Sequence, residues 1–198
     1  HQPRRQRQMC IRDSINTAYN SIRNEFNRDL LIKWEEGKTG IPIIDACMRC
    51  LNETGYLNFR MRAMIVSFAA FNLWQNWKNF SHFLARKFLD YEPGIHYSQI
   101  QMQSAVTGIN TVRIYNPIKN SILLDPEGEF IKKWVSELKS VPKEYIHEPW
   151  KMTKIEQEMY NFSISDNYFS PIIDIEQSRK NASEKIWKIR KGSKSIIH

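Results

Sequence analysis

This 198-residue chain contains little glycine or proline, which interrupt helices and strands, and little cysteine, which can cross-link a fold. It has seven glycines, eight prolines and three cysteines, too little glycine and proline for a low-complexity or linker-rich protein. No apolar run reaches the roughly 18 uncharged residues of a membrane span, and no secretory signal opens the chain. We therefore expect one folded domain, no membrane partner and a cytoplasmic location.

The cysteines are too sparse for a metal centre. Cys47 and Cys50 form a C-x-x-C, but zinc needs four ligands, and neither a second C-x-x-C nor an H-x-x-x-H follows. Their spacing places both thiols on one face of a helix expected to begin at Pro42. We expect no metal site and interpret both thiols as small buried groups in a reducing compartment.

Positive charge is in excess. The net charge is +8 and the pI about 9.4, which fits a polyanionic partner without requiring one. The opening segment HQPRRQRQMCIRDS contributes +3 of this charge, so that the rest of the chain keeps +5. This segment lacks apolar periodicity and resembles a translated adapter sequence. We expect residues 1–14 to be a leader outside the folded domain, which would cover 15–198.

Apolar spacing predicts helices almost throughout, with no confident strand, so the expected fold class is all-α. Gly37, Gly40 and Gly55 are predicted to end helices. We expect a loop over 107–124 and a polar, proline-punctuated stretch over 140–173. The expected helices cover residues 13–32, 42–52, 59–77, 81–88, 96–106, 125–138 and 174–190.

Two arginines, Arg60 and Arg62, stand at the mouth of the most apolar expected helix, which continues as MIVSFAAFNLW. A guanidinium that enters a low-dielectric interior needs an anion. A carboxylate from elsewhere in the fold, or a phosphate of a cofactor or nucleic acid, would serve. The residues alone leave these alternatives open.

Four segments in order resemble the FAD-binding helical region of the photolyase and cryptochrome family: WEEGKTGIPIIDACMRCLNETGYLNFRMR (34–62), RIYNP (113–117), DPEGEFIKKWVSELKSVP (125–142) and IHEPW (146–150). The resemblance implies a multi-helix bundle corresponding to the C-terminal part of that domain, with residues 15–198 as a partial domain. Family members also carry an amino-terminal α/β domain and further helices before the match to Trp34. We therefore expect a fragment, with an antenna chromophore possible only in the full-length parent.

FAD is the cofactor that the resemblance implies. Asp90 matches an aspartate that pairs, beside the flavin, with the arginine matched by Arg62, and the two would form a buried ion pair. Glu92 stands where the family commonly has an aspartate facing the flavin or adenine, and Tyr91 lies between these acids. His96 matches the position that faces flavin N5. From the residues alone, an ion pair without a ligand and a histidine that caps a helix remain alternatives.

Damaged DNA is the partner that the resemblance implies. Arg60 and Arg113 match arginines that reach DNA phosphates around a flipped-out lesion, although Arg113 could instead cap a surface loop. Phe59 stands where repair enzymes have an asparagine that bonds the dimer. Met102 replaces a tryptophan that flanks the dimer.

Electron transfer is the remaining role that the resemblance assigns. Trp77 matches the middle tryptophan of the family's electron-transfer chain, whose member nearest the flavin is replaced by Ile100. A path through Trp74, Tyr91 or Tyr97 is an alternative that spacing does not test.

The resemblance implies a deoxyribodipyrimidine photolyase-like flavoprotein, a carbon–carbon lyase that repairs pyrimidine dimers by light-driven electron transfer from FAD. A cryptochrome-like blue-light photoreceptor without repair activity is one alternative. A flavin-free, basic, helical DNA-binding module is another. We expect the protein to act as a monomer.

Overall fold

Helices form almost all of the secondary structure. The computed structural model describes residues 22–194 except 25, 108–111, 165 and 167. Within these ranges no strand forms, and an isolated bridge joins Ile164 to Tyr168. The prediction of an all-α multi-helix bundle is therefore confirmed. The α-helices are α3 (Arg28–Glu35), α4 (Pro42–Thr54), α5 (Phe59–Ser67), α6 (Trp77–Lys87), α7 (Pro93–Gln103), α8 (Pro117–Leu124), α9 (Glu129–Trp134), α10 (Lys154–Met159) and α11 (Ile175–Lys194). The shorter helices are the π-helix η1 (Phe68–Asn72) and the 3₁₀ helices η2 (Ser136–Leu138) and η3 (Pro149–Lys151).

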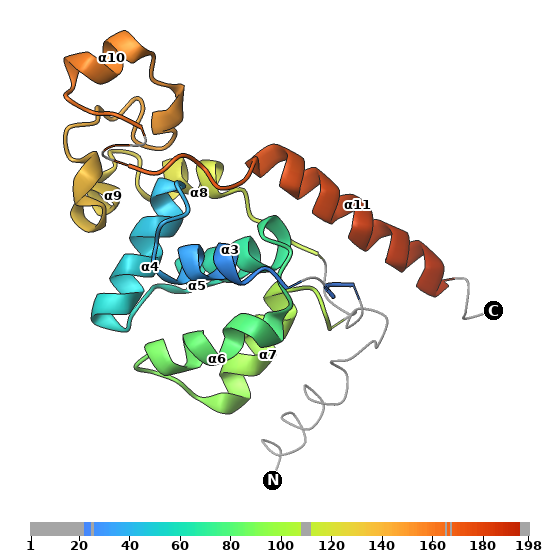
Figure 1. The fold of residues 1–198 in the computed structure, drawn as a ribbon. Helices are drawn as coiled ribbons and strands as arrows, with labels where there is room; N and C mark the ends of the chain where they lie inside the picture. The colour runs from blue at the N-terminus through green and yellow to red at the C-terminus, as the bar shows by residue number, and fades with distance from the viewer. Residues whose placement is uncertain (1–21, 25, 108–111, 165, 167, 195–198) are drawn as a thin grey trace.

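Helix α4 contacts α3, α5, α8 and α9, and it lies between α9 and α5 (Figure 1). Pro42 occupies its first turn, and most of its side chains are apolar and buried. Gly55 ends it with φ of 69°, and a side chain there would come within 2.6 Å of Leu89. The carbonyl of Gly55 accepts a hydrogen bond from the N–H of Leu89 at 3.1 Å. The end of α4 thereby fixes the segment that leads into α7.

One buried carboxylate holds the turn between α3 and α4. Asp45 accepts hydrogen bonds from the N–H and the hydroxyl of Thr39, both at 2.7 Å, and from the N–H of Gly40 at 3.0 Å. Tyr168 donates its hydroxyl to the same carboxylate. Burial raises the pKa of Asp45 to about 6, against the opposing effect of these donors. Asp45 thus joins the turn to a residue 123 positions away.

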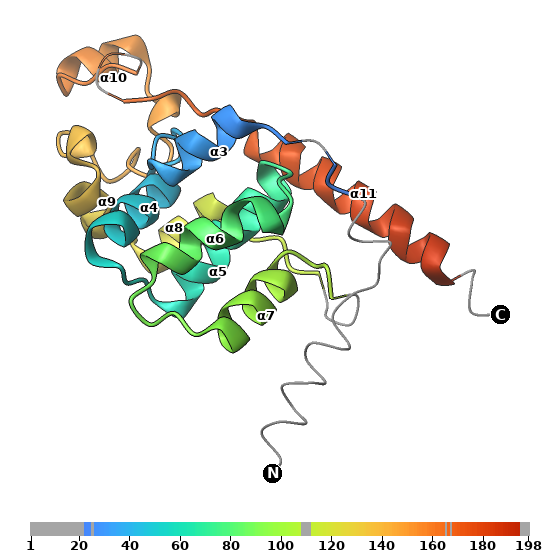
Figure 2. The same ribbon diagram turned by 60° about the horizontal axis from the view of Figure 1, so that its bottom comes forward.

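Helix α11 runs along one side of the bundle and extends beyond it (Figures 1 and 2). It packs on η1, with Ala182 and Ile186 buried. The side-chain amide of Asn72 donates to the hydroxyl of Ser178 at 2.9 Å. Because η1 continues directly from α5, α11 supports the same long helical segment that carries α5.

Two predicted helix boundaries in the middle of the chain are wrong. The helix expected over 59–77 ends at Asn72, and a new helix begins at Trp77. Its cap is Asn76, whose side chain accepts the N–H of Lys78 at 3.1 Å. Ser81, near which we expected this helix to start, is buried inside α6.

One further helix starts earlier than predicted and another forms where a loop was expected, each beginning at a proline. Helix α7 begins at Pro93 and not at residue 96, because Glu92 caps it. The loop expected over 107–124 becomes helix α8 from Pro117, because Asn116 caps that helix. An acceptor side chain followed by proline is a helix start in both cases.

The ends of the chain also differ from prediction. The helix expected over 13–32 begins at Arg28, with Asn27 as its cap, and residues 13–21 lie outside the described part. So does the leader proposed for residues 1–14, and the division into 1–14 and 15–198 stays a prediction. The helix expected over 125–138 shortens to α9 and η2, and α11 continues past residue 190.

None of the helices in the described ranges combines the length and apolar composition that crossing a bilayer requires. Those ranges also contain no group of three or more His, Cys, Asp or Glu side chains that could hold a metal ion. Cys47 and Cys50 are buried free thiols.

Candidate functional site

A hollow of about 260 Å³ lies between α5, α7 and the segment that joins α6 to α7. We call it the α5–α7 pocket. Helix α5 contributes residues 59, 62, 63 and 66, and α7 contributes residues 95, 96, 99, 100 and 103. Both sets follow helical spacing, so each helix presents one stripe. Its lining is Phe59, Arg62, Ala63, Val66, Phe88, Asp90, Tyr91, Glu92, Ile95, His96, Gln99, Ile100 and Gln103.

Arg62 and Asp90 form the predicted ion pair, with Nη1 of Arg62 at 2.9 Å from Oδ1 of Asp90. The Nε of Arg62 also donates to the carbonyl of Leu57 at 2.6 Å, and the guanidinium lies 4.3 Å from the ring centroid of Phe88. Both charges are less buried than expected, since 25% of the Arg62 side chain and 57% of the Asp90 side chain are exposed. The hydrogen bond from Arg62 lowers the pKa of Asp90. The pair is thus formed, but it lies at the pocket edge and not in the core.

His96 lies on the wall of the pocket with its orientation fixed by α6. Its Nε2 is 2.9 Å from the carbonyl of Ser81. A carbonyl only accepts hydrogen bonds, so Nε2 carries the proton and Nδ1 is an acceptor in the neutral ring. Burial lowers the pKa of His96, which favours that neutral form. The helix cap is Glu92, whose carboxylate accepts from Ile95 at 2.8 Å, so the alternative of His96 as the cap is wrong.

The lining fits a planar heterocycle that has a polar edge. Phe59, Phe88 and Tyr91 supply aromatic surface, and Ala63 and Ile100 are buried apolar residues. Gln99 supplies a polar atom, because its Oε1 is buried and has no hydrogen-bond partner in the described structure. Flat aromatic walls with a few placed polar groups are typical of cofactor sites. The residues present therefore suit the isoalloxazine or adenine ring of FAD.

A series of rings leads from the pocket to α6. Tyr97 lies between Tyr91 and Trp77, with ring centroids 6.5 and 6.4 Å away respectively. It also packs on His96, at 5.1 Å. Trp77 itself does not line the pocket. Ile100 does, and it carries no aromatic ring at the position where the resemblance expects one.

The residues expected to contact DNA are only partly brought together. Phe59 lines the pocket and is 63% exposed. Arg60 and Arg113 are exposed, one on α5 and the other on the irregular segment before α8. Met102 is half-buried on α7. Arg60, Arg113 and Met102 do not line the pocket.

Sequence reasoning missed several lining residues, chiefly Gln99 and Gln103. Neither belongs to a quoted motif. Both follow His96 at helical spacing, three and seven positions later. A helix with one member in a site brings its i+3, i+4 and i+7 neighbours to the same face. Extending the stripe from His96 would have predicted both.

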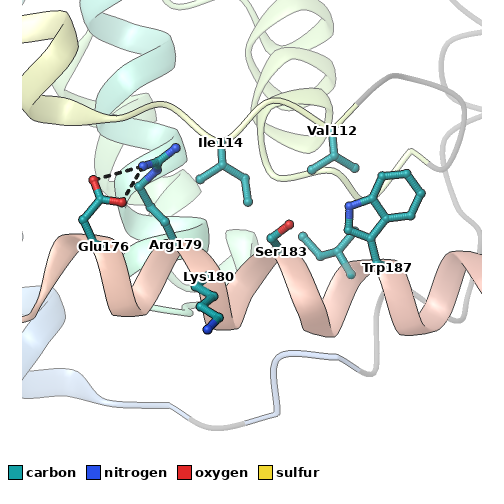
Figure 3. Close-up of a pocket in the computed structure, with 8 residues that line it drawn as sticks. Val112, Ile114, Glu176, Arg179, Lys180, Ser183 and Trp187 are labelled. Carbon is teal, nitrogen blue, oxygen red and sulfur yellow. Dashed lines mark hydrogen bonds and ion pairs between the residues drawn. The ribbon is translucent and has the colours of Figure 1, made fainter.

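A second hollow of about 440 Å³ lies between α11 and residues 112–114 (Figure 3). Val112 and Ile114 line the side that faces α11, and Trp187 stands at one end. Arg179 points toward Glu176, with Nη1 at 3.1 and 3.2 Å from the two carboxylate oxygens. None of the candidate site residues lines this hollow.

Comparisons with known proteins converge on one family. The profile of the FAD binding domain of DNA photolyase matches residues 1–188. Deoxyribodipyrimidine photo-lyase of Alkalihalophilus pseudofirmus is 35% identical over 176 residues, covering 87% of this chain and 36% of that protein. Cryptochrome-1 of Drosophila melanogaster is 34% identical over 159 residues, covering 78% of this chain and 29% of that protein.

The fold is also found in a solved structure. The archaeal photolyase from Sulfolobus tokodaii with two FAD molecules matches with a TM-score of 0.74 at 34% identity, over 86% of this chain and 37% of that one. The chain thus spans about a third of the length of these relatives. The profile match begins at residue 1 and so includes the segment 1–14.

Proposed function

Since this chain belongs to the photolyase and cryptochrome family through its FAD-binding domain, we propose that it binds FAD in the α5–α7 pocket and serves light-driven repair of pyrimidine dimers in DNA. The observation that carries the proposal is the pocket, which gathers every expected cofactor residue: Arg62, Asp90, Tyr91, Glu92 and His96. The relative named deoxyribodipyrimidine photo-lyase supports the repair reaction.

In this proposal the chain's own residues bind and orient the cofactor. Arg62 presents a cation whose direction is set by Leu57 and Asp90, so little reorganisation accompanies binding. His96 offers Nδ1 as an acceptor, because Ser81 holds its other nitrogen as a donor. Bound FAD would supply the light absorption and the electron that splits the dimer. Trp77 is proposed to take part in electron transfer, and its ring contact with Tyr97 supports this role.

Damaged DNA is the proposed substrate. Exposed guanidinium groups at Arg60 and Arg113 suit phosphate oxygens, which position a strand without reading its sequence. A dimer flipped out of the stack would meet apolar surface at Phe59 and Met102. We propose that the protein acts as a monomer in the cytoplasm and that any antenna chromophore binds outside this chain.

Two arginines on one helix allow a reciprocal test. The 198-residue chain is titrated into FAD, and binding is followed by flavin fluorescence. Arg62→Ala removes a residue of the pocket wall and should weaken FAD binding by about tenfold. Arg60→Ala, a matched change at an exposed site, should leave FAD binding unchanged and weaken binding to a dimer-containing oligonucleotide. Equal FAD affinity in the unaltered chain and Arg62→Ala would contradict the proposed site.

Repair is tested by illumination. The chain loaded with reduced FAD and dimer-containing DNA is exposed to blue light, and thymine absorbance should return. A cryptochrome-like photoreceptor is the second candidate, favoured by the match to cryptochrome-1 and by the phenyl group of Phe59 at the pocket wall. Retention of FAD with no restored thymine would favour that candidate.

A further inference from the structure

We propose that Gln99 determines which planar ligand the α5–α7 pocket accepts, with its side-chain oxygen taking a hydrogen bond from an N–H group on the ligand's edge. The inference rests on the proposed function and names a contact that no quoted motif contains. Gln99 lies on α7, one turn after His96 and on the same pocket wall.

An unsatisfied acceptor is the observation behind this assignment. Oε1 of Gln99 is buried and has no hydrogen-bond partner in the described structure. Such an atom lowers the stability of a fold unless something donates to it. Of the polar groups on the pocket wall, Arg62 directs its Nε and Nη1 to Leu57 and Asp90, and Nε2 of His96 donates to Ser81, so that none of these donors serves Gln99. A donor on a bound ligand is the group that would satisfy Gln99.

The chemistry of FAD offers two such donors. An isoalloxazine ring carries an N–H at N3, and an adenine ring carries an exocyclic amino group. Both are planar and suit walls that contain Phe59, Phe88 and Tyr91. A site that holds an acceptor against a ligand N–H discriminates against ligands that lack it, because the acceptor is then left unpaired.

The test compares Gln99→Met with Gln101→Met. Methionine keeps the length of the side chain and removes its hydrogen-bonding amide. Gln101 is the matched control, because it lies on the same helix and does not line the pocket. Binding of FAD, riboflavin and ADP to the full 198-residue chain is measured for each variant. Thermal melting of each variant without ligand is measured in parallel.

Gln99→Met should weaken FAD binding by roughly threefold to tenfold, and Gln101→Met should not. A parallel loss for riboflavin assigns the contact to the isoalloxazine ring, and a parallel loss for ADP assigns it to adenine. Without ligand, Gln99→Met should raise the Tm by about 2–4 °C, because the unpaired acceptor is gone.

Unchanged affinity for all three probes in Gln99→Met, or a Tm that does not rise, would overturn the role of Gln99. A different result would overturn the proposed function and leave the role of Gln99 in place: the unaltered chain binds neither FAD nor riboflavin, but it binds ADP, and Gln99→Met weakens the binding of ADP. If the unaltered chain binds none of the probes, both proposals are overturned.

Discussion

At the scale of single residues, the rule that a guanidinium inside a fold needs an anion gives an incomplete account. Arg62 has its carboxylate but is partly exposed. Arg23 is only 4% exposed, and it donates Nε to the carbonyl of Ala70 at 2.9 Å. It lies over the rings of Phe71 and Trp74, at 5.2 and 4.9 Å. Burial lowers the pKa of Arg23 to about 10. The aromatic faces of Phe71 and Trp74 take the place of a carboxylate beside Arg23. These contacts join segments far apart in the sequence, so no local sequence pattern predicts them.

Two substitutions separate packing from charge at Arg23. Arg23→Met keeps an apolar stem of similar reach and removes a desolvated cation, so the free energy of unfolding should change by less than about 1 kcal/mol. Arg23→Ala leaves a cavity beside Trp74 and should lower it by about 2–3 kcal/mol. Urea unfolding measures both. Equal losses would show that the cation–π contacts stabilise the fold more than the apolar stem does.

Asp45 gives a prediction about pH. Its pKa is about 6 in the folded chain and 3.8 as a free side chain. Between pH 3.8 and about 6 the folded state binds more protons at Asp45 than the unfolded state does. The stability that Asp45 contributes therefore falls as the pH rises through this range, by up to about 3 kcal/mol. Asp45→Asn removes this titration and turns an amide N–H toward the donors of Thr39 and Gly40.

The measurement is urea unfolding of both proteins at about pH 4.5 and about pH 7. The unaltered chain should exceed Asp45→Asn in stability by more at the lower pH. An advantage that grows with pH would mean that the hydrogen bonds to the ionised carboxylate outweigh its burial.

At the scale of elements, the boundaries set by local chemistry were predictable. Pro42 and Gly55 bound α4 as the sequence predicts. Asn116-Pro117 lies in the segment that the sequence wrongly predicts to be a loop, because the same dipeptide can start a turn or cap a helix. It caps α8, with Asn116 accepting from Lys119 at 3.1 Å. The neighbouring sequence alone did not decide between the two.

The break between η1 and α6 depends on tertiary contacts. Trp74 has φ of 55°, which is unfavourable for a residue with a side chain. Its ring lies 4.9 Å from the guanidinium of Arg23 and 4.6 Å from the ammonium of Lys185 on α11. Contacts from both ends of the described chain therefore accompany this conformation. Apolar periodicity through residues 59–77 contains no information about them.

The candidate site, too, was predictable in part from sequence and depends in part on tertiary contacts. The five residues expected to contact a cofactor were predicted from motif resemblance, and the structure gathers all five at one pocket. Composition and spacing alone predicted only that Arg62 needs an anion. The sequence overestimates the burial of the Arg62–Asp90 pair, because the apolar composition of the helix that follows Arg62 predicts a buried segment and the side chains of the pair are 25% and 57% exposed. Exposure at the end of a helix depends on its neighbours in space.

At the scale of the whole molecule, the pocket and α11 are connected through one helical segment. Helix α5 carries the pocket stripe and continues into η1, and α11 packs on η1 with Ile186 buried at 2% exposure. Asn72 and Ser178 add a hydrogen bond across this contact. The carboxyl-terminal helix should therefore stabilise the pocket wall although it contributes no lining residue.

Ile186→Ala tests this connection. Loss of the buried side chain should lower the free energy of unfolding by about 2–4 kcal/mol, from lost transfer energy and the cavity that remains. Lys188→Ala, at an exposed position two residues later, should have no measurable effect. Hydrogen exchange measures where the loss appears. If α11 and the pocket form one cooperative unit, amides of α5 and η1 should exchange faster together with those of α11. Faster exchange confined to α11 would instead show that this helix opens by itself and leaves the wall of the pocket intact.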